Sequence, residues 1–521
     1  MSLSGLKRML DQRTKDSGAT RRPKPVAVPS VKYDRPTLVV SNSFCELHQV
    51  PAEVLAQVAE ALTYKNEAVA QEKIRTFRLI SMAKSRGNRG LLYKLRLRLD
   101  ELDEQEIVCW LKGNRFPTGL LAIVKDLLAE SGIACEVKDT RKAPSHFNNF
   151  KWWIEPPAAR YYQAEMVALA KEHGRGVLES AVGTGKSLIL TQILKDLQVN
   201  SLIVVPSIAL LGQLQYGLER AFGKKNICTI STASVRSKKR LAPLRLTTVQ
   251  TLAALRKKGM LQEVISDIDL IAVDEIHHAG SKSYTDLLPE LEHVYYRFGF
   301  TGTFLRNDCK TLDMWGFLSN RLYSYPAWKA TEEGFLTPVE FVIHTLPGKR
   351  CQNYQKEYSS NYCGKPSLLE EIAAIMEQVS ESEQVLILVD RKDEAGLVIH
   401  EYLKGLGIEN AYISGDDKKD HITETIQAFN RKEIRRLVGS TIIGEGVDLH
   451  STDQLILARG GKSEIAIVQA IGRAIRLSPG KDKAIVHDFR FSGTKFLEKH
   501  LGQRLEIYRN SFGGEITEQD V

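Results

Sequence analysis

Residues 180–187 read Ser180-Ala181-Val182-Gly183-Thr184-Gly185-Lys186-Ser187, a short glycine-containing loop between two apolar segments. Residues 176–179 before it predict a buried strand, and residues 188–194 after it predict a helix. A loop of this kind at a helix N-terminus lets backbone N–H groups approach phosphate groups, and the helix dipole favours the anion. We therefore expect Lys186 to neutralise phosphate charge and the Ser187 hydroxyl to reach Mg²⁺.

A second chemical segment follows the apolar run of residues 270–273, which is continued by Asp274, Glu275, Ile276 and His277. A parallel sheet presents ligand groups at the carboxyl ends of its strands. Asp274 would then hold Mg²⁺ beside the phosphates, and Glu275 would orient and deprotonate the attacking water. The alternative is an ordinary strand followed by an acidic helix cap. The phosphate loop in the same domain favours the catalytic interpretation.

A third segment, residues 469–476, reads Gln469-Ala470-Ile471-Gly472-Arg473-Ala474-Ile475-Arg476. Arg473 and Arg476 are three residues apart, so a helix places them on one face. A transferred phosphoryl group develops charge that a permanently charged, forked guanidinium can stabilise. A solvated basic face is the alternative for an isolated pair of this spacing. Together the three segments predict hydrolysis of a nucleoside triphosphate at an interface.

These three segments resemble the Walker A, DExH and arginine-finger motifs of superfamily 2 helicases. Residues 385–391, 413–416 and 440–448 resemble the later motifs of that superfamily in the same order. The resemblance implies ATP contacts at Gln163, Gly183, Thr184, Gly185, Lys186, Ser187, Gly446, Asp448 and Gln469. It implies nucleic-acid contacts at Pro206, Thr248, Gln250 and Thr441, and coupling of hydrolysis to movement through His277, Thr301 and Thr303.

A narrower resemblance is carried by residues 113–121, Gly-Asn-Arg-Phe-Pro-Thr-Gly-Leu-Leu, and residues 331–338, Thr-Glu-Glu-Gly-Phe-Leu-Thr-Pro. Both segments are similar to the bacteriophage UvsW-type helicases. That family remodels branched DNA, so fork regression and branch migration are the implied activities. The chain departs from the pattern at Ser180, where glycine is usual, and in a longer, very basic N-terminus.

The charge of the chain is unevenly distributed. The net charge is +9, and nine Lys and Arg residues fall between Lys73 and Arg98 without one Asp or Glu. Residues 93–99 alternate leucine with cations, which predicts a strand that presents Lys94, Arg96 and Arg98 on one face and leucines to a core. We interpret that face as a nucleic-acid contact, with a solvated sheet face as the alternative.

The expected fold class is α/β, with two tandem RecA-like parallel-sheet domains preceded by a small α+β accessory domain. The expected boundaries are a basic disordered N-terminus (1–31), the accessory nucleic-acid-binding domain (32–141), the ATP-binding domain (142–330), a linker (331–350), the second RecA-like domain (351–491) and a helical tail (492–521). The tail is expected to be an amphipathic helix that packs on the second domain, with DNA contact as the alternative.

The remaining features exclude several classes. The seven cysteines show no C-x-x-C spacing, so neither a zinc site nor a disulfide framework is indicated, and a reducing bacterial or phage-infected cytoplasm is expected. No apolar run is long enough to span a membrane. We expect ATP and Mg²⁺ as cofactors, branched DNA as the partner and a monomer on that substrate. An RNA helicase and an ATP-gated nucleic-acid-binding regulator are the alternatives.

Overall fold

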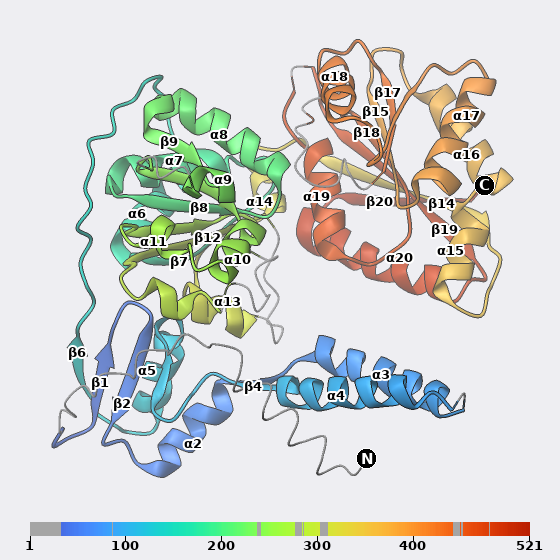
Figure 1. Cartoon of the computed structure of the whole chain (residues 1–521). Helices are drawn as coiled ribbons and strands as arrows, with labels where there is room; N and C mark the ends of the chain where they lie inside the picture. The colour runs from blue at the N-terminus through green and yellow to red at the C-terminus, as the bar shows by residue number, and fades with distance from the viewer. Residues whose placement is uncertain are drawn as a thin grey trace.

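The computed structural model describes residues 33–85, 87–236, 241–276, 284, 286–302, 311–440, 449, 452–478 and 480–520. It contains two seven-stranded sheets, each with only parallel pairings, and a smaller four-stranded mixed sheet. The expected fold class is therefore confirmed. The two large sheets lie side by side, and the small sheet lies below the first (Figure 1).

The accessory domain has a mixed sheet of order β5-β2-β1-β6. Its strands are β1 (Thr37–Val40), β2 (Phe44–His48), β5 (Arg115–Pro117) and β6 (Glu136–Asp139). Helices α2 (Ala52–Ala61) and α5 (Leu121–Glu130) pack on it. A short antiparallel pair, β3 (Thr63–Lys65) and β4 (Ile107–Cys109), leads out of this domain and back.

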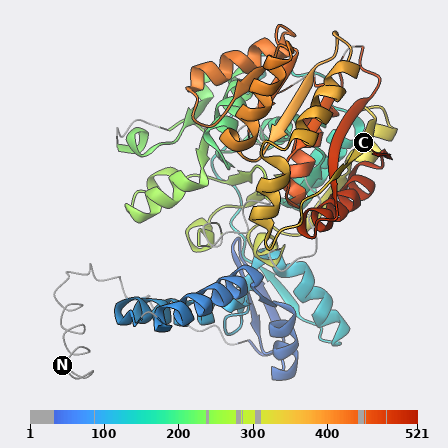
Figure 2. The same ribbon diagram turned by 90° about the vertical axis from the view of Figure 1, so that its right-hand side faces the viewer.

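Between β3 and β4 the chain forms two long antiparallel helices, α3 (Glu67–Ser85) and α4 (Arg89–Glu106), which we call the arm. The arm projects away from the accessory domain and lies below the second large domain (Figure 1), and the turned view shows the same projection (Figure 2).

The strand predicted over residues 93–99 is wrong, because this segment belongs to α4. Leu92, Leu95, Leu99 and Leu102 recur at helical spacing and lie on the less exposed side of α4, with Leu102 fully buried. Residues two apart in a helix are about 200° apart around its axis, so Lys94, Arg96 and Arg98 do not share one face. Arg98 instead pairs with Glu72 at 2.8 Å and Glu101 at 2.9 Å.

The first large domain has strand order β13-β7-β12-β11-β8-β10-β9. The strands are β7 (Arg175–Ser180), β8 (Ser201–Val205), β9 (Ile227–Thr229), β10 (Leu244–Thr248), β11 (Leu270–Val273), β12 (Tyr296–Thr301) and β13 (Arg321–Tyr325). Alternate residues enter different cores: Leu178 packs on one face of the sheet and Val177 on the other. Strands buried on both faces read as continuous apolar runs, which explains the sequence pattern.

Helices cover this sheet. They are α6 (Tyr161–His173), α7 (Lys186–Leu197), α8 (Ile208–Phe222), α9 (Thr232–Arg236), α10 (Val249–Lys257), α11 (Gln262–Ile265), α13 (Thr311–Phe317) and α14 (Ala327–Glu332). The phosphate-loop residues connect β7 to α7, the strand and helix predicted on either side of the loop.

The second large domain has strand order β16-β17-β15-β18-β19-β14-β20. The strands are β14 (Val339–Pro347), β15 (Val385–Val389), β16 (Ala411–Ile413), β17 (Arg436–Gly439), β18 (Gln454–Ala458), β19 (Ala484–Ser492) and β20 (Glu515–Asp520). Its helices are α15 (Tyr354–Tyr362), α16 (Pro366–Gln378), α17 (Val398–Gly405), α18 (Lys419–Asn430), α19 (Glu464–Ala474) and α20 (Phe496–Ile507).

Two segments outside the expected second domain belong to its sheet. Residues 331–350 were predicted to be a linker, but β14 lies within them and pairs with β19 over nine residues. The tail forms the predicted helix as α20, which packs on β19, and then adds β20 parallel to β14. Glu357 on α15 holds the start of α20, because its buried carboxylate accepts hydrogen bonds from the backbone N–H groups of Lys495, Phe496 and Leu497.

Candidate active site

The phosphate loop has the backbone that its glycines predict. Gly183 and Gly185 have φ values of 90° and 91°, in the region that favours glycine. A Cβ on Gly185 would lie 2.5 Å from Gln163 Nε2, so a side chain there would displace that amide. The unusual Ser180 is buried, and its hydroxyl hydrogen-bonds the Thr184 hydroxyl. The serine thus ties the start of the loop to its middle.

Gln163 lies under the phosphate loop. Its side-chain amide donates to the Thr184 carbonyl at 2.9 Å, and its carbonyl oxygen accepts from the Arg160 backbone N–H at 2.8 Å. The Tyr162 hydroxyl donates to the same Thr184 carbonyl at 2.8 Å. In this arrangement Gln163 supports the loop backbone, and the adenine contact implied by the resemblance stays a prediction.

Asp274 and Glu275 follow β11 at the carboxyl edge of the first sheet, beside the phosphate loop. Asp274 accepts a hydrogen bond from the Glu275 backbone N–H at 3.0 Å, and Glu275 has a positive φ of 48°. This turn brings Glu275 Oε1 to 3.6 Å from Lys186 Nζ. Burial, reinforced by the Glu275 carboxylate, raises the pKa of Asp274 to about 6.

The donors beside Lys186 fit a magnesium ion. Mg²⁺ takes hard oxygen ligands and is usually held by one or two carboxylates, hydroxyls and substrate phosphates. Asp274 supplies a carboxylate and Ser187 a hydroxyl, and both line the same cavity. Two carboxylates close enough to raise a pKa also create an excess of negative charge that a cation would balance. Among the described residues, no group of three or more His, Cys, Asp and Glu forms a separate metal site.

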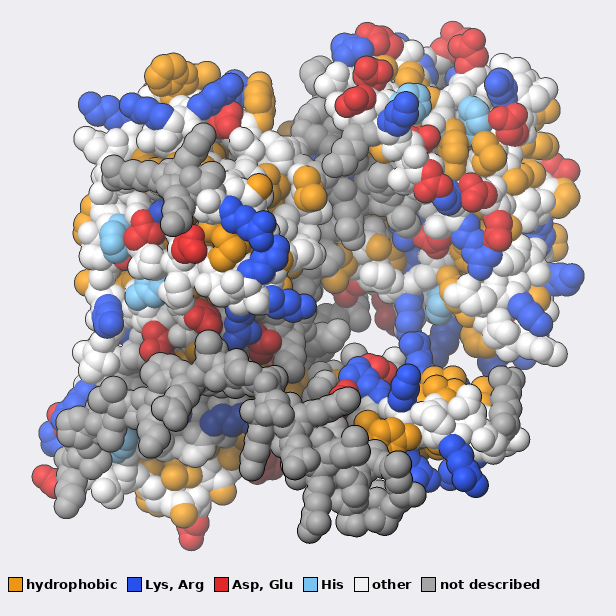
Figure 3. All heavy atoms as spheres, in the orientation of Figure 1, with side chains coloured by type: hydrophobic (Ala, Val, Ile, Leu, Met, Phe, Trp, Pro, Cys, Tyr) orange, Lys and Arg blue, Asp and Glu red, His pale blue; other side chains and the backbone are white. Residues whose placement is uncertain are grey.

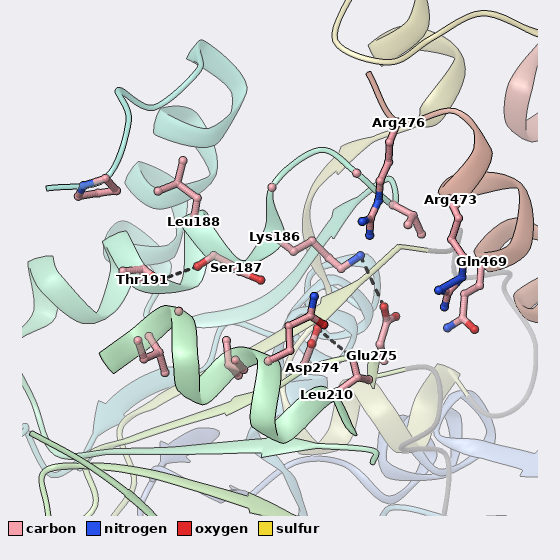
Figure 4. Close-up of a pocket in the computed structure, with 18 of the residues that line it drawn as sticks. Lys186, Ser187, Leu188, Thr191, Leu210, Asp274, Glu275, Gln469, Arg473 and Arg476 are labelled. Atoms are coloured by element: carbon pink, nitrogen blue, oxygen red, sulfur yellow. Dashed lines mark hydrogen bonds and ion pairs between the residues drawn. The ribbon is translucent and has the colours of Figure 1, made fainter. Parts of the chain in front are cut away.

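Helix α19 of the second domain forms the opposite wall. Gln469, Arg473 and Arg476 line the cavity and face the phosphate loop and Glu275 (Figure 4). The helix approaches the loop closely because residue 472 is glycine: a Cβ there would lie 2.5 Å from Val182 Cβ. The linker residue Thr337 also holds α19, since its N–H donates to the Ile475 carbonyl at 2.8 Å.

A buried lysine holds the C-terminal end of the same helix. Lys481 Nζ hydrogen-bonds the carbonyls of Ala474, the last residue of α19, and Thr452. Burial lowers the pKa of Lys481 to about 8. Cations near a helix C-terminus satisfy carbonyls that have no partner within the helix. Lys481 is therefore a positioning residue for the helix that carries Arg473. The prediction that one helix holds both arginines is wrong, because α19 ends at Ala474 and Arg476 lies two residues beyond it.

The cavity has a volume of ≈ 660 Å³, which is a typical size for a small-molecule site. Sequence reasoning missed several of its lining residues. Among them are Arg160 and Phe335, whose guanidinium and ring stack with 4.5 Å to the ring centroid. In the sequence, Arg160 stands three residues before Gln163, and Phe335 stands within residues 331–338 at the domain junction. Neither position by itself specifies a role.

The other predicted residues fall in three groups. Pro206 lines the cavity, and the nucleic-acid contact expected there stays a prediction. Thr248 caps α10 by accepting from the Thr251 N–H at 3.3 Å, Gln250 is exposed beside it, and Thr301 is buried at the end of β12. His277, Thr303, Thr441, Gly446 and Asp448 lie outside the described residues.

Family models match both halves of this site. Residues 157–306 match the type III restriction enzyme res subunit, and residues 364–478 match the helicase conserved C-terminal domain. The first match contains the phosphate loop and Asp274-Glu275, and the second contains α19, Arg473 and Arg476. The chain is a superfamily 2 helicase. Among its described residues, no helix has the length and apolarity needed to cross a membrane.

Relatives of the helicase are distant in sequence and come from viruses, archaea and yeasts. The ATP-dependent DNA helicase uvsW of Enterobacteria phage T4 is 25% identical over 356 residues, which are 64% of this chain and 68% of uvsW. A protein of Sulfolobus islandicus filamentous virus that carries a helicase name is 24% identical over 374 residues, 66% of this chain and 65% of that protein. The chain spans 51% of IRC3 of Saccharomyces cerevisiae, at 24% identity over 371 residues.

Solved structures confirm the fold of the helicase. A fragment of an HsdR subunit of a type I restriction enzyme from Vibrio vulnificus YJ016 matches with a TM-score of 0.53 at 18% identity, over 71% of this chain and 70% of that one. Dbp5 of S. cerevisiae bound to RNA and ADP BeF3 matches with a TM-score of 0.50 at 16% identity, over 69% of this chain and 89% of Dbp5. One fold therefore serves proteins of different activities.

Proposed function

We propose that this helicase hydrolyses ATP with Mg²⁺ and uses the energy to unwind or remodel branched DNA, by fork regression or branch migration in replication, recombination and repair. The observation that carries the ATPase proposal is the shared cavity. Lys186, Asp274 and Glu275 line it from one domain, and Arg473 and Arg476 line it from the other. The similarity to phage T4 uvsW, named a DNA helicase, supports DNA as the substrate.

In the proposed reaction, residues of the first large domain bind the phosphates and activate the attacking water. Lys186 neutralises phosphate charge, and the N–H groups of the loop before α7 cradle the phosphates. Glu275 orients and deprotonates the attacking water, and Lys186 Nζ lies 3.6 Å from its Oε1. Mg²⁺ held by Ser187 and Asp274 would supply further positive charge to the phosphates.

Arg473 and Arg476 couple the chemistry to movement. Their guanidinium groups reach the transition-state charge only when α19 lies against the phosphate loop, as the short approach of Gly472 to Val182 allows. ATP binding would therefore favour closure of the two domains, and product release would favour opening. Two nucleic-acid grips, one on each domain, would then move relative to each other with every cycle.

Steady-state ATPase rates test the proposal. The rates are measured with forked DNA, a four-way junction, single-stranded DNA, blunt duplex DNA and RNA, and Lys186→Ala serves as the control for contaminating ATPases. We expect the strongest stimulation by the fork or the junction, followed by strand displacement on the same substrate. Stimulation by RNA alone would instead support an RNA helicase. Nucleic-acid binding without strand displacement or translocation would support an ATP-gated regulator.

A further inference from the structure

The arm exposes far more apolar surface than a hairpin of two helices in water requires. Helix α3 exposes Ile74, Phe77, Leu79 and Met82, and helix α4 exposes Leu91, Tyr93 and Leu97. Phe77 is 54% exposed and Tyr93 is 60% exposed. The buried side chains between the two helices, such as Ile80 and Leu102, form a separate inner seam. Grouped exposed apolar side chains of this kind mark interaction sites.

The charges on the arm favour a polyanionic partner. Between residues 73 and 99 the sequence has nine Lys and Arg and no Asp or Glu. The acidic residues sit at the base, where Asp103 and Glu106 pair with Lys73, and Glu72 pairs with Arg98. Toward Gly87 and Asn88, the described parts of both helices (residues 73–85 and 89–99) contain cations and no carboxylate. Blue and orange side chains lie next to each other along the arm in Figure 3.

The base of the arm is fixed to the first motor domain. Trp110, directly after β4, donates from Nε1 to Asp313 on α13 at 2.9 Å. Ser43 accepts from the buried Arg297 of β12 at 2.5 Å. A Cβ on Gly119 would lie 1.8 Å from the Trp315 carbonyl oxygen, so the backbones of the two domains touch there. The base of the arm is thus packed against the domain that carries the phosphate loop.

We propose that the arm is a pin that contacts unpaired bases at a DNA fork or junction. Aromatic and apolar side chains stack on bases without regard to sequence, and interspersed cations neutralise the backbone phosphates. Phe77 and Tyr93 supply the rings, and Arg75, Arg78 and Lys94 supply the charge. Because the pin is fixed to the first domain, closure of the second domain would draw a strand past it. The inference rests on the proposed DNA motor function.

A variant with Phe77→Ala and Tyr93→Ala tests the pin. Both side chains are more than half exposed, so their removal leaves the cores intact. We expect ATPase measured without nucleic acid to stay within twofold of the unsubstituted protein. Strand displacement on a fork should fall about tenfold, in line with the loss of one stacked base. Quenching of 2-aminopurine placed at the fork should also be lost. Leu406→Ala, which removes an equally exposed side chain of the second domain, is the matched control.

The outcomes separate the two proposals. Fork unwinding and quenching unchanged in the double variant, with an active unsubstituted protein, would overturn the pin and leave the motor in place. A shift from dimer to monomer in the variant, with unwinding unchanged, would make the arm a contact between copies and would also overturn it. An unsubstituted protein that no nucleic acid stimulates would refute the motor function on which the pin depends.

Discussion

Gly472→Ala is the sharpest test of the interface that completes the nucleotide site. The added methyl carbon would lie 2.5 Å from Val182 Cβ and 2.9 Å from Val182 Cγ1. The shortest favourable separation between carbon atoms is roughly 3.5 Å. Helix α19 must therefore retreat from the phosphate loop by about 1 Å, or the loop must distort. Arg473 is one residue further along the helix and would retreat with it.

The magnitude follows from that displacement. A misplacement of about 1 Å in a catalytic group costs on the order of 10²-fold in rate. We therefore expect kcat for ATP hydrolysis with single-stranded DNA to fall between about 10-fold and 100-fold. The affinity for a fluorescent ATP analogue should change little, since the phosphate loop, Asp274 and Gln163 belong to the first domain. Alanine also favours helix over glycine by about 1 kcal/mol, so the second domain itself should not lose stability.

Gly502→Ala is the control, because this helical glycine of the same domain has open space where a Cβ would be. It should leave kcat unchanged while making the same chemical change within a helix. Wild-type kcat in Gly472→Ala would refute the reasoning, since it would mean that the arginines act without close contact between α19 and the loop. A loss of ATP binding equal to the loss of kcat would place the damage in the phosphate loop itself.

Three further predictions concern the catalytic base and the docking of the outer segments. Glu275→Gln should retain ATP binding and lower single-turnover hydrolysis by about 10²-fold to 10⁴-fold, the usual contribution of a general base, and a rate near wild type would exclude that role. Gly119→Ala should lower the unfolding free energy by about 1–3 kcal/mol, because the added Cβ would clash with the Trp315 carbonyl, and a lower thermal midpoint would show it. Gly90→Ala is the control and should not lower the midpoint, because the nearest atom to its Cβ lies 3.9 Å away. Glu357→Gln should destabilise the protein at pH 7 by about 1–3 kcal/mol, since one amide oxygen replaces a carboxylate that accepts four backbone N–H groups. Burial opposes ionisation of Glu357, but these hydrogen bonds hold the pKa of its carboxyl below the usual value. The stabilisation of the folded protein by this carboxylate is therefore complete above about pH 4.5 and is lost as the pH falls through the lowered pKa. The difference in unfolding free energy between Glu357→Gln and wild type, measured by urea denaturation, should shrink toward pH 3.

The sequence predicted the chemistry better than the packing around it. Lys186, Asp274 and Glu275 could be found because a phosphate loop and a strand that ends in carboxylates are local patterns with a fixed geometry. Arg160 and Phe335 could not be assigned, since their contact joins residues 175 positions apart in the chain. Residues 339–347 were taken as linker for the same reason: β14 is a strand only because β19 and β20 lie on either side of it.

The error in the arm has a different cause. Residues 93–99 carry two periods at once, an alternation of leucine with cations and a helical series of leucines that starts at Leu92 and continues to Leu102. The alternation spans seven residues, whereas the helical series continues past both of its ends. The longer pattern prevails because α3 offers it a partner of equal length. Tyr93 and Leu97 then remain exposed, at 60% and 47%. This mismatch between an apolar sequence and a two-helix structure is the observation that supports the proposed role of the arm.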